Sequence, residues 1–429
     1  MTAIDWEEAT AEATSLLREY IRIDTSNPPG NEARAVSFFS EILDAEGIAY
    51  EVAESAPGRS NLLARIGPGG PGVCLLNHTD VVPVERQFWS VDPFGGELRD
   101  GHIWGRGALD MKGMGIIELM TLLVLKRTGA PLKRGVSFLA AADEEAGSAC
   151  GVEWLAEHRP EWLKCDLAIN EGAYGLGGLP GLPPIFQISP SEKVPLWLRL
   201  VARGRPGHGS VPHDDNCADR LIAALGRLQA WKQPLRITPL MRDHAAAMVR
   251  AGVLRSDSDQ GIISAAGRNA ALRARLSNTV VLTTLSAGIK VNVIPAEASA
   301  TLDCRLLPDV DVDGFVAAAR TVIDDERIEI EILNRSQGAA TSMDHEFVRV
   351  LDDVLGEMVE GSHMVPELTS GFTDSRILRR LGVAAFGFVP CLVPPEELAG
   401  IHGHNEHISV ENLRLGMQIL HRVMLRLCV

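Results

Sequence analysis

The first half of the chain alternates between segments with strand-like and helix-like spacing of apolar residues. Strand-like runs occupy residues 73–77, 136–142 and 166–170, the first of them with the apolar run Val73 to Leu76, and helical patterns occupy 5–20, 31–46, 112–128 and 151–158. Strands and helices that alternate in this way predict a mostly parallel sheet covered by helices. This part of the chain should therefore have an α/β fold.

Near residue 190 the pattern changes. Strand-like segments at 194–203, 279–285, 296–305 and 327–333 are interleaved with helical segments at 217–231 and 312–324. This β-α-β-β-α-β order predicts a split-βαβ sandwich. The α/β pattern returns after about residue 336, with a strand at 383–390 and a helix from about 409.

We therefore expect an α+β domain at residues 191–336, inserted into an α/β domain built from residues 1–190 and 337–429. The pattern at residues 232–277 predicts an irregular or helical addition, but it does not define where this addition lies in the fold.

Composition narrows the class of protein. The 429 residues suffice for two domains, and the net charge of −15, spread along the chain, argues against nucleic acid as a partner. Seven scattered cysteines without a CxxC pair indicate a reducing compartment. The chain shows neither a signal-peptide pattern nor an apolar run of membrane-spanning length. We expect a soluble, cytoplasmic protein without membrane contact.

The predicted strand at 73–77 runs directly into His78, which is followed by Asp80. Because alternate residues of a strand share a face, Asp80 can accept the second ring N–H of His78, as metal-bound histidines require. We interpret His78 as a metal ligand with Asp80 behind it. The alternative is a polar strand end without chemistry.

Further polar residues lie at comparable positions of the same domain. They are Asp110 in the glycine-flanked turn 105–113, Glu144 and Glu145 after the strand at 136–142, Glu171 after the strand at 166–170, and His402, His404 and His407 before the last helix. Other interpretations are a phosphate-binding turn, an acidic helix start and a surface histidine cluster. Imidazoles and carboxylates at one sheet edge suit Zn²⁺, with Co²⁺ or Mn²⁺ as alternatives.

In order and spacing, these motifs resemble the M20 metallopeptidase family. The residues that carry the resemblance are His78-Thr79-Asp80, Gly105 to Gly113, Asp143-Glu144-Glu145, Asn170-Glu171-Gly172 and Ile401 to Glu406. The resemblance implies a zinc-exopeptidase-like fold with a lid and dimerisation domain. It also implies a dizinc hydrolase of the aminoacylase or carboxypeptidase type, which releases an amino acid from an N-acyl amino acid or small peptide.

The resemblance assigns a role to each candidate residue. Asp110 would bridge two zinc ions from a turn with a cis peptide bond before Met111, His78 and Glu171 would complete one zinc site, and Glu145 and His402 would complete the other. Glu144 is left as the general base. Asn170 departs from the aspartate often found there, which affects a contact behind the ligands rather than the ligand set.

The resemblance extends to the inserted domain. His208 would stabilise the oxyanion of the reaction, either in its own subunit or across a homodimer formed through the lid. Asn292 and Arg305 match substrate-contacting positions, and Arg376 follows a turn similar to the family's second substrate loop. Since arginine binds both oxygens of a carboxylate, we expect a substrate with a free carboxylate next to the scissile amide. In the alternative, Arg305 simply pairs with Asp303 or Asp309.

Other functions are compatible with parts of the pattern. The protein could deacylate another N-acylated carboxylate metabolite, or it could bind metal in this fold without catalysis. A non-metal esterase would need a G-x-S-x-G nucleophile motif, which the sequence lacks.

Overall fold

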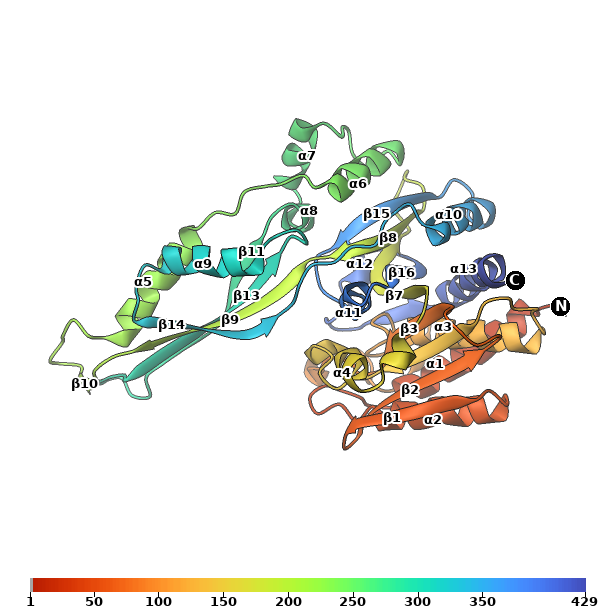
Figure 1. Cartoon of the computed structure of the whole chain (residues 1–429), viewed down its shortest axis with the longest axis horizontal. Coiled ribbons are helices and arrows are strands. Elements are labelled where there is room, and N and C mark those ends of the chain that lie inside the picture. Colours follow the sequence, from red (N-terminus) through yellow and green to blue (C-terminus); the bar gives the residue numbers. More distant parts are fainter. Residues whose placement is uncertain (1–2) are drawn as a thin grey trace.

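An eight-stranded sheet forms the centre of the larger part of the molecule in the computed structural model, which describes residues 3–429 (Figure 1). In spatial order the strands are β1 (Tyr50–Ala56), β2 (Arg59–Ile66), β6 (Val136–Ala141), β3 (Val73–His78), β7 (Leu167–Leu176), β16 (Ala384–Val393), β8 (Ile185–Glu192) and β15 (His363–Thr369). Neighbouring strands are parallel from β6 to β16 and between β8 and β15. This confirms the predicted helix-covered, mostly parallel sheet.

Helices cover both faces of this sheet. One face carries α1 (Trp6–Ile21), α2 (Ala33–Ala45), α3 (Lys112–Arg127), α10 (Glu346–Met358) and α13 (Val410–Cys428), and the other carries α4 (Val152–His158), η3 (Pro160–Leu163) and α11 (Ser375–Arg380). The side chains of β3 divide accordingly, with Val73 and Leu75 in one core and Cys74 and Leu76 in the other. A strand buried on both faces explains the continuous apolar run seen in the sequence.

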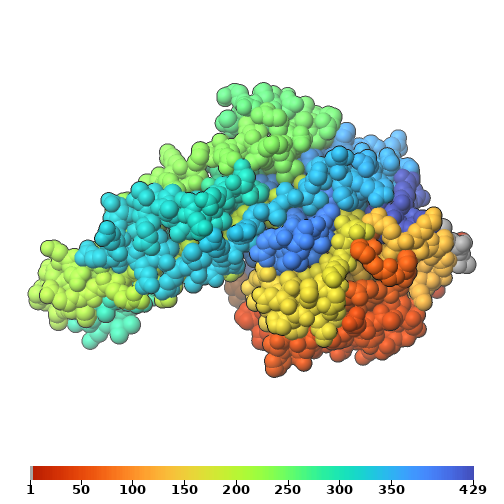
Figure 2. Space-filling view, viewed as in Figure 1, coloured from red at the N-terminus to blue at the C-terminus, as the bar shows by residue number. Residues whose placement is uncertain are grey.

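A four-stranded antiparallel sheet forms an arm that projects from this body (Figures 1 and 2). Its order is β11 (Thr279–Ala287), β13 (Glu297–Leu306), β9 (Val194–Arg203) and β14 (Ile328–Arg335), and α5 (Cys217–Ala230) and α9 (Val312–Ile323) pack on one face. The predicted β-α-β-β-α-β element order is present. We propose that this arm corresponds to the predicted domain 191–336, and we call it the lid.

Residues 232–277, unplaced by the sequence, form three helices beside the junction of the two sheets. They are α6 (Pro239–Arg250), α7 (Asp259–Ala266) and α8 (Ala270–Arg275). Helix α6 packs on β15, where the ring Nδ1 of His244 lies 2.9 Å from the carbonyl oxygen of Pro366. The insertion therefore contacts the edge of the larger sheet.

Several short elements complete the fold. The strands β4 (Glu97–Arg99), β5 (His102–Trp104) and β17 (His407–Ser409) form a small antiparallel sheet, and β10 (Gly207–His208) pairs with β12 (Val293–Ile294) at the lid tip. The remaining short helices are η1 (Arg86–Phe88), η2 (Glu144–Ala146) and α12 (Pro395–Leu398). Across residues 3–429, the helices all lack the length and apolar character that crossing a membrane requires.

Candidate metal centre

The carboxyl ends of three parallel strands bring most of the candidate ligands together. His78 is the last residue of β3, Glu145 lies in η2 directly after β6, and Glu171 lies within β7, which continues beyond the predicted strand end. Ligands in open α/β sheets bind at this edge. Asp110 and His402 reach the same place from the turn before α3 and from the loop before β17.

The carboxylate of Asp110 lies between two imidazoles. Its Oδ1 atom is 3.1 Å from Nε2 of His78, and its Oδ2 atom is 3.2 Å from Nε2 of His402. The peptide bond between Asp110 and Met111 is cis, as the family resemblance implied. With one oxygen directed to each histidine, this carboxylate has the orientation needed to join two adjacent cation sites.

Each histidine also faces a second carboxylate. Nε2 of His78 lies 3.6 Å from Oε1 of Glu171, and Nε2 of His402 lies 3.2 Å from Oε2 of Glu145. His78, Asp110 and Glu145 also offer ligand atoms within 4.8 Å of one another, as do His78, Glu144 and Glu171, so the donors form one continuous cluster around Asp110 and His78. The Oε1 atoms of Glu144 and Glu145 are buried and lack a hydrogen-bond partner within residues 3–429. These donor types and bare carboxylate oxygens fit two divalent cations.

Burial and mutual repulsion dominate the electrostatics of the cluster. Burial, reinforced by neighbouring carboxylates, raises the pKa values of Glu144 and Glu171 well above their usual range. Burial acts in the same direction on Asp110, but hydrogen bonds from His402 and His78 hold its pKa below the usual value. Hydrogen bonds to Asp110 and Glu145 raise the pKa of His402 to about 10. Cations placed between these groups would relieve the repulsion.

Asp80 contacts the second ring nitrogen of His78, but its nearest atom is the backbone carbonyl oxygen rather than the carboxylate. The ring Nδ1 of His78 lies 2.9 Å from the backbone carbonyl oxygen of Asp80, whereas its distance to the Asp80 carboxylate is 3.4 Å. The carboxylate instead accepts hydrogen bonds from the backbone N–H groups of Glu144 (3.1 Å) and Glu145 (3.2 Å) and from the Asn27 side chain (2.8 Å). Asp80 thus positions two acidic residues as well as the ring of His78.

A second supporting residue, Glu406, was missed by sequence reasoning. Its buried carboxylate accepts hydrogen bonds from the backbone N–H groups of Gly107, Leu109 and Asp110, and from the guanidinium of Arg106. Four donors on one carboxylate hold the turn that presents Asp110. Glu406 closes the motif that contains His402, but nothing local in the sequence indicates which backbone it contacts.

A layer of buried charge lies behind Asp80. Glu32 and Asp143 both pair with Arg59, at 2.6 and 2.5 Å, and Asn27 donates to Asp143 at 2.9 Å. Glu32, Asp80 and Asp143 have the composition of a metal site. Because Arg59 already pairs with two of these carboxylates and Asn27 donates to the group, we interpret it as support for η2.

The lid residues His208 and Asn292 lie together but away from this cluster. His208 pairs with Val293 between β10 and β12, and the N–H of Gly209 donates to the carbonyl of Asn292 at 2.9 Å. These strands form the far tip of the lid (Figure 1). The ring of His208 is exposed, and Nδ1 accepts a hydrogen bond from the N–H of Ser210 at 3.1 Å.

The two candidate carboxylate-binding arginines meet at one phenyl ring. Arg305 of the lid and Arg376 of the larger domain lie 4.9 and 4.7 Å from the ring centroid of Phe372. Arg305 pairs with Asp303 at 2.7 Å, the alternative foreseen in the sequence, yet its Nη1 is buried without a partner within residues 3–429. Arg376 donates to two backbone carbonyls, those of Thr373 and Gly147. Arg305 therefore retains the freer N–H group.

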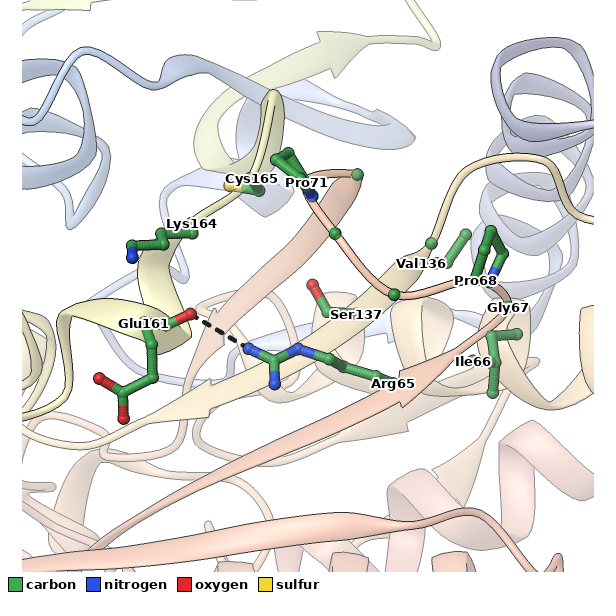
Figure 3. A pocket seen from close by; sticks show the side chains of 14 residues that line it. Arg65, Ile66, Gly67, Pro68, Pro71, Val136, Ser137, Glu161, Lys164 and Cys165 are labelled. Carbon is green, nitrogen blue, oxygen red and sulfur yellow. Dashed lines mark hydrogen bonds between the residues drawn. The ribbon is translucent and has the colours of Figure 1, made fainter.

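A separate surface cavity lies at the opposite edge of the large sheet (Figure 3). It is bordered by the glycine- and proline-rich loop 67–72 and by the start of β6, and Arg65 reaches across it to the carbonyl of Glu161 at 3.3 Å. None of the candidate ligands lines this cavity. We therefore place the functional site at the carboxyl edge.

Residues 74–426 match the family model described as Peptidase family M20/M25/M40. The chain therefore belongs to this family, as its motifs predicted, and it is a hydrolase of amide or peptide bonds. Aminoacylase-1 of Sus scrofa is 30% identical to it over 418 residues, which cover 95% of this chain and 93% of that protein. The similarity thus includes the lid.

Two further comparisons agree with the assignment to this family. The N-fatty-acyl-amino acid synthase/hydrolase PM20D1 of Xenopus tropicalis is 30% identical over 362 residues, which cover 80% of this chain and 70% of that protein. The structure of the M20 family metallo-carboxypeptidase Sso-CP2 from Sulfolobus solfataricus superposes with a TM-score of 0.77 at 19% identity, covering 97% of this chain and 99% of that one. The latter similarity shows a shared fold.

Proposed function

We propose that this protein is a dizinc hydrolase that releases an amino acid from an N-acyl amino acid or small peptide. The observation that carries the proposal is the Asp110 carboxylate, which directs one oxygen to His78 and the other to His402. His78, Asp110 and Glu171 would hold one ion, and Asp110, Glu145 and His402 would hold the other. Zn²⁺ suits these donors best, with Co²⁺ or Mn²⁺ as substitutes.

Glu144 is the general base of the proposed reaction. When bound, two zinc ions would polarise the scissile carbonyl and lower the pKa of an attacking water. Glu144 takes the proton of this water through its buried Oε1 atom, which no other residue among 3–429 engages. The same carboxyl group then passes this proton to the leaving nitrogen.

The lid supplies the remaining groups in this proposal. His208 donates a hydrogen bond to the oxyanion, and Asn292, its neighbour at the lid tip, contacts the substrate. Because both lie at the far end of the arm, they reach an active site by lid movement or by belonging to the partner in a homodimer. Exposed apolar residues on the edge strand β11, among them Leu282 and Leu285, favour pairing of two lids.

Arg305 and Arg376 are the proposed receptors for the substrate carboxylate. Both adjoin Phe372, and Arg305 has a buried, unpartnered Nη1 for an incoming oxygen. Two relatives with names that specify acylated amino acids, aminoacylase-1 and the N-fatty-acyl-amino acid synthase/hydrolase, favour this substrate class over others. The scattered cysteines, all present as free thiols, accord with the cytoplasmic location that we propose.

A panel of N-acyl amino acids and dipeptides, assayed with zinc-loaded and chelator-treated protein, tests the proposal. We expect release of a free amino acid that depends on metal and is restored by zinc. Equal rates after exhaustive chelation would contradict the dizinc mechanism. A zinc-dependent preference for acylated carboxylates that are not amino acids would instead identify a deacylase of another metabolite.

A further inference from the structure

A second group of metal-binding residue types lies outside the proposed dizinc site. It consists of His102 at the start of β5, His407 at the start of β17 and Glu397 in α12. In the sequence, His407 belongs to the histidine-rich segment before the last helix, and the proposed reaction leaves it without a role. We call these three residues the His-Glu-His group.

The small sheet places the two histidines on one face. In its antiparallel register, His407 pairs with Trp104 and Ser409 pairs with His102. Because alternate residues share a face, His102 and His407 are diagonal neighbours on adjacent strands. Their rings lie 5.2 Å apart, and Trp104 stacks on His407 at 4.1 Å, which restricts the orientation of that ring.

Backbone hydrogen bonds fix the same tautomer in both rings. Nδ1 of His102 lies 2.8 Å from the carbonyl of Asp100, and Nδ1 of His407 lies 2.7 Å from the carbonyl of Asn405. A carbonyl can only accept, so each Nδ1 carries a proton, and in the neutral ring each Nε2 presents a lone pair. This arrangement is typical of metal-bound histidine, and His78 uses the same contact with the carbonyl of Asp80.

Both Nε2 atoms face the carboxylate of Glu397. Nε2 of His102 lies 3.8 Å from Oε1, and Nε2 of His407 lies 3.8 Å from Oε2. These separations are too long for hydrogen bonds. They are close to the roughly 3.4 Å that separates two ligands of a tetrahedral zinc ion with bonds of about 2.1 Å. The carboxylate and the rings would need to approach by only a few tenths of an ångström.

We propose that the His-Glu-His group is a third divalent-metal site, suited to Zn²⁺. Two neutral imidazoles and one carboxylate are a common zinc ligand set, and the partial exposure of all three side chains leaves room for water as a fourth ligand. The ion would join α12 to β5 and β17. The segment between α12 and β17 carries His402 and Glu406, so the third site would hold one border of the proposed dizinc centre.

Metal stoichiometry tests this inference separately from the dizinc proposal. Chelator-stripped full-length protein would be dialysed against buffered micromolar Zn²⁺ and analysed for zinc per chain. We expect Glu397→Gln and His102→Gln to bind one ion fewer than the unmodified protein, whatever the occupancy of the main centre. His158→Gln is the matched control, because His158 also directs Nδ1 to a backbone carbonyl, and no ion pair within residues 3–429 includes its ring. Equal zinc content in all four proteins would overturn the proposal.

Tryptophan fluorescence provides a second measurement at the same place. Co²⁺ bound to His407 should quench Trp104, which stacks on that ring, and Trp104→Phe identifies this component of the titration. We expect Glu397→Gln to shift the midpoint of this quenching titration to a Co²⁺ concentration at least about tenfold higher, because changing even a residue behind the ligands lowers metal affinity by that much. An unchanged midpoint would show that Glu397 is not a ligand.

Discussion

The carboxylate of Glu406 accepts a hydrogen bond from the backbone N–H of Asp110 at 3.0 Å. The same carboxylate binds the backbone of Gly107 and Leu109 and pairs with the buried Arg106. A residue four positions after one proposed ligand, His402, therefore fixes the backbone of another, Asp110. The two motifs form one structural unit although most of the chain separates them.

Glu406→Gln should weaken metal binding without removing a ligand. The amide presents N–H donors to groups that are themselves donors, so the turn before α3 loses part of its support. We expect the zinc affinity of the main centre to fall by about 10- to 100-fold, the usual effect of changing a residue behind the ligands. Zinc titration with Glu411→Gln, an exposed change in α13, as control measures this effect. Unaltered affinity would show that the turn is rigid without Glu406.

Glu144→Gln and Glu145→Gln should have different effects although the residues are adjacent. Removing the base should lower kcat by about 10²-fold or more and leave metal content unchanged. Removing the proposed ligand Glu145 should reduce metal content as well as activity. Elemental analysis measures the metal content of both variants, and steady-state kinetics measures their kcat. Metal loss in Glu144→Gln alone would mean that the two roles are reversed.

The sequence predicted the elements that hold the proposed ligands because their signals are local. Strand β3 begins with the apolar run Val73 to Leu76 and ends at His78, and the helical pattern of α3 begins directly after the Asp110 turn. The small sheet of β4, β5 and β17 was missed because each strand has three residues and depends on pairing between distant segments. Contacts of Asn27 and Arg59 with Asp143 escaped prediction for the same reason.

Asp80 shows that a sequence pattern can predict a contact between two residues without identifying the atoms that make it. The spacing of His78 and Asp80 predicted a contact between them, and such a contact exists, but the backbone carbonyl rather than the carboxylate lies closest to the ring. The strand ends at His78, so strict alternation of side chains does not continue to Asp80. Which atom of a residue makes a contact depends on this local departure from strand geometry.

Arg305→Met should remove the preference for a free carboxylate. If Arg305 binds that group, the unmodified protein should favour an acid over its carboxamide by about 2–5 kcal/mol, which is roughly 30-fold or more in kcat/KM. The variant should lose most of this difference. Arg199→Met is a suitable control, since Arg199 lies on the lid sheet and pairs with Glu331. Equal kcat/KM for acid and amide in the unmodified protein would contradict carboxylate recognition.

His208→Ala should lower kcat more than it raises KM, because a hydrogen bond to an oxyanion acts mainly in the transition state. His213→Ala, in the same loop, should have a much smaller effect on kcat. Steady-state kinetics of both variants on one substrate give kcat and KM separately. A change confined to KM would make His208 a substrate-contact residue.

His244 should make stability depend on pH. Burial between α6 and β15 lowers its pKa from 6.5 to about 4. The unfolded chain therefore takes up a proton before the folded chain does, and stability falls as the pH drops from about 6.5 towards 4. His244→Asn keeps a donor for the Pro366 carbonyl but does not titrate. The free energy of unfolding, measured with denaturant, should fall between pH 7 and pH 5 in both proteins, and by about 2 kcal/mol less in the variant. Identical pH dependence would show that folding does not change the pKa of His244.

The position of the lid within the chain also sets the order in which the catalytic domain is completed during synthesis. Strand β16 lies between β7 and β8 in the large sheet, yet the ribosome makes it only after the whole lid. Until then, a nascent chain has unpaired strand edges and four of the five proposed ligands, because His402 comes later still. Full occupancy of the centre thus requires translation past His402, which would make metal loading a late event that follows lid folding.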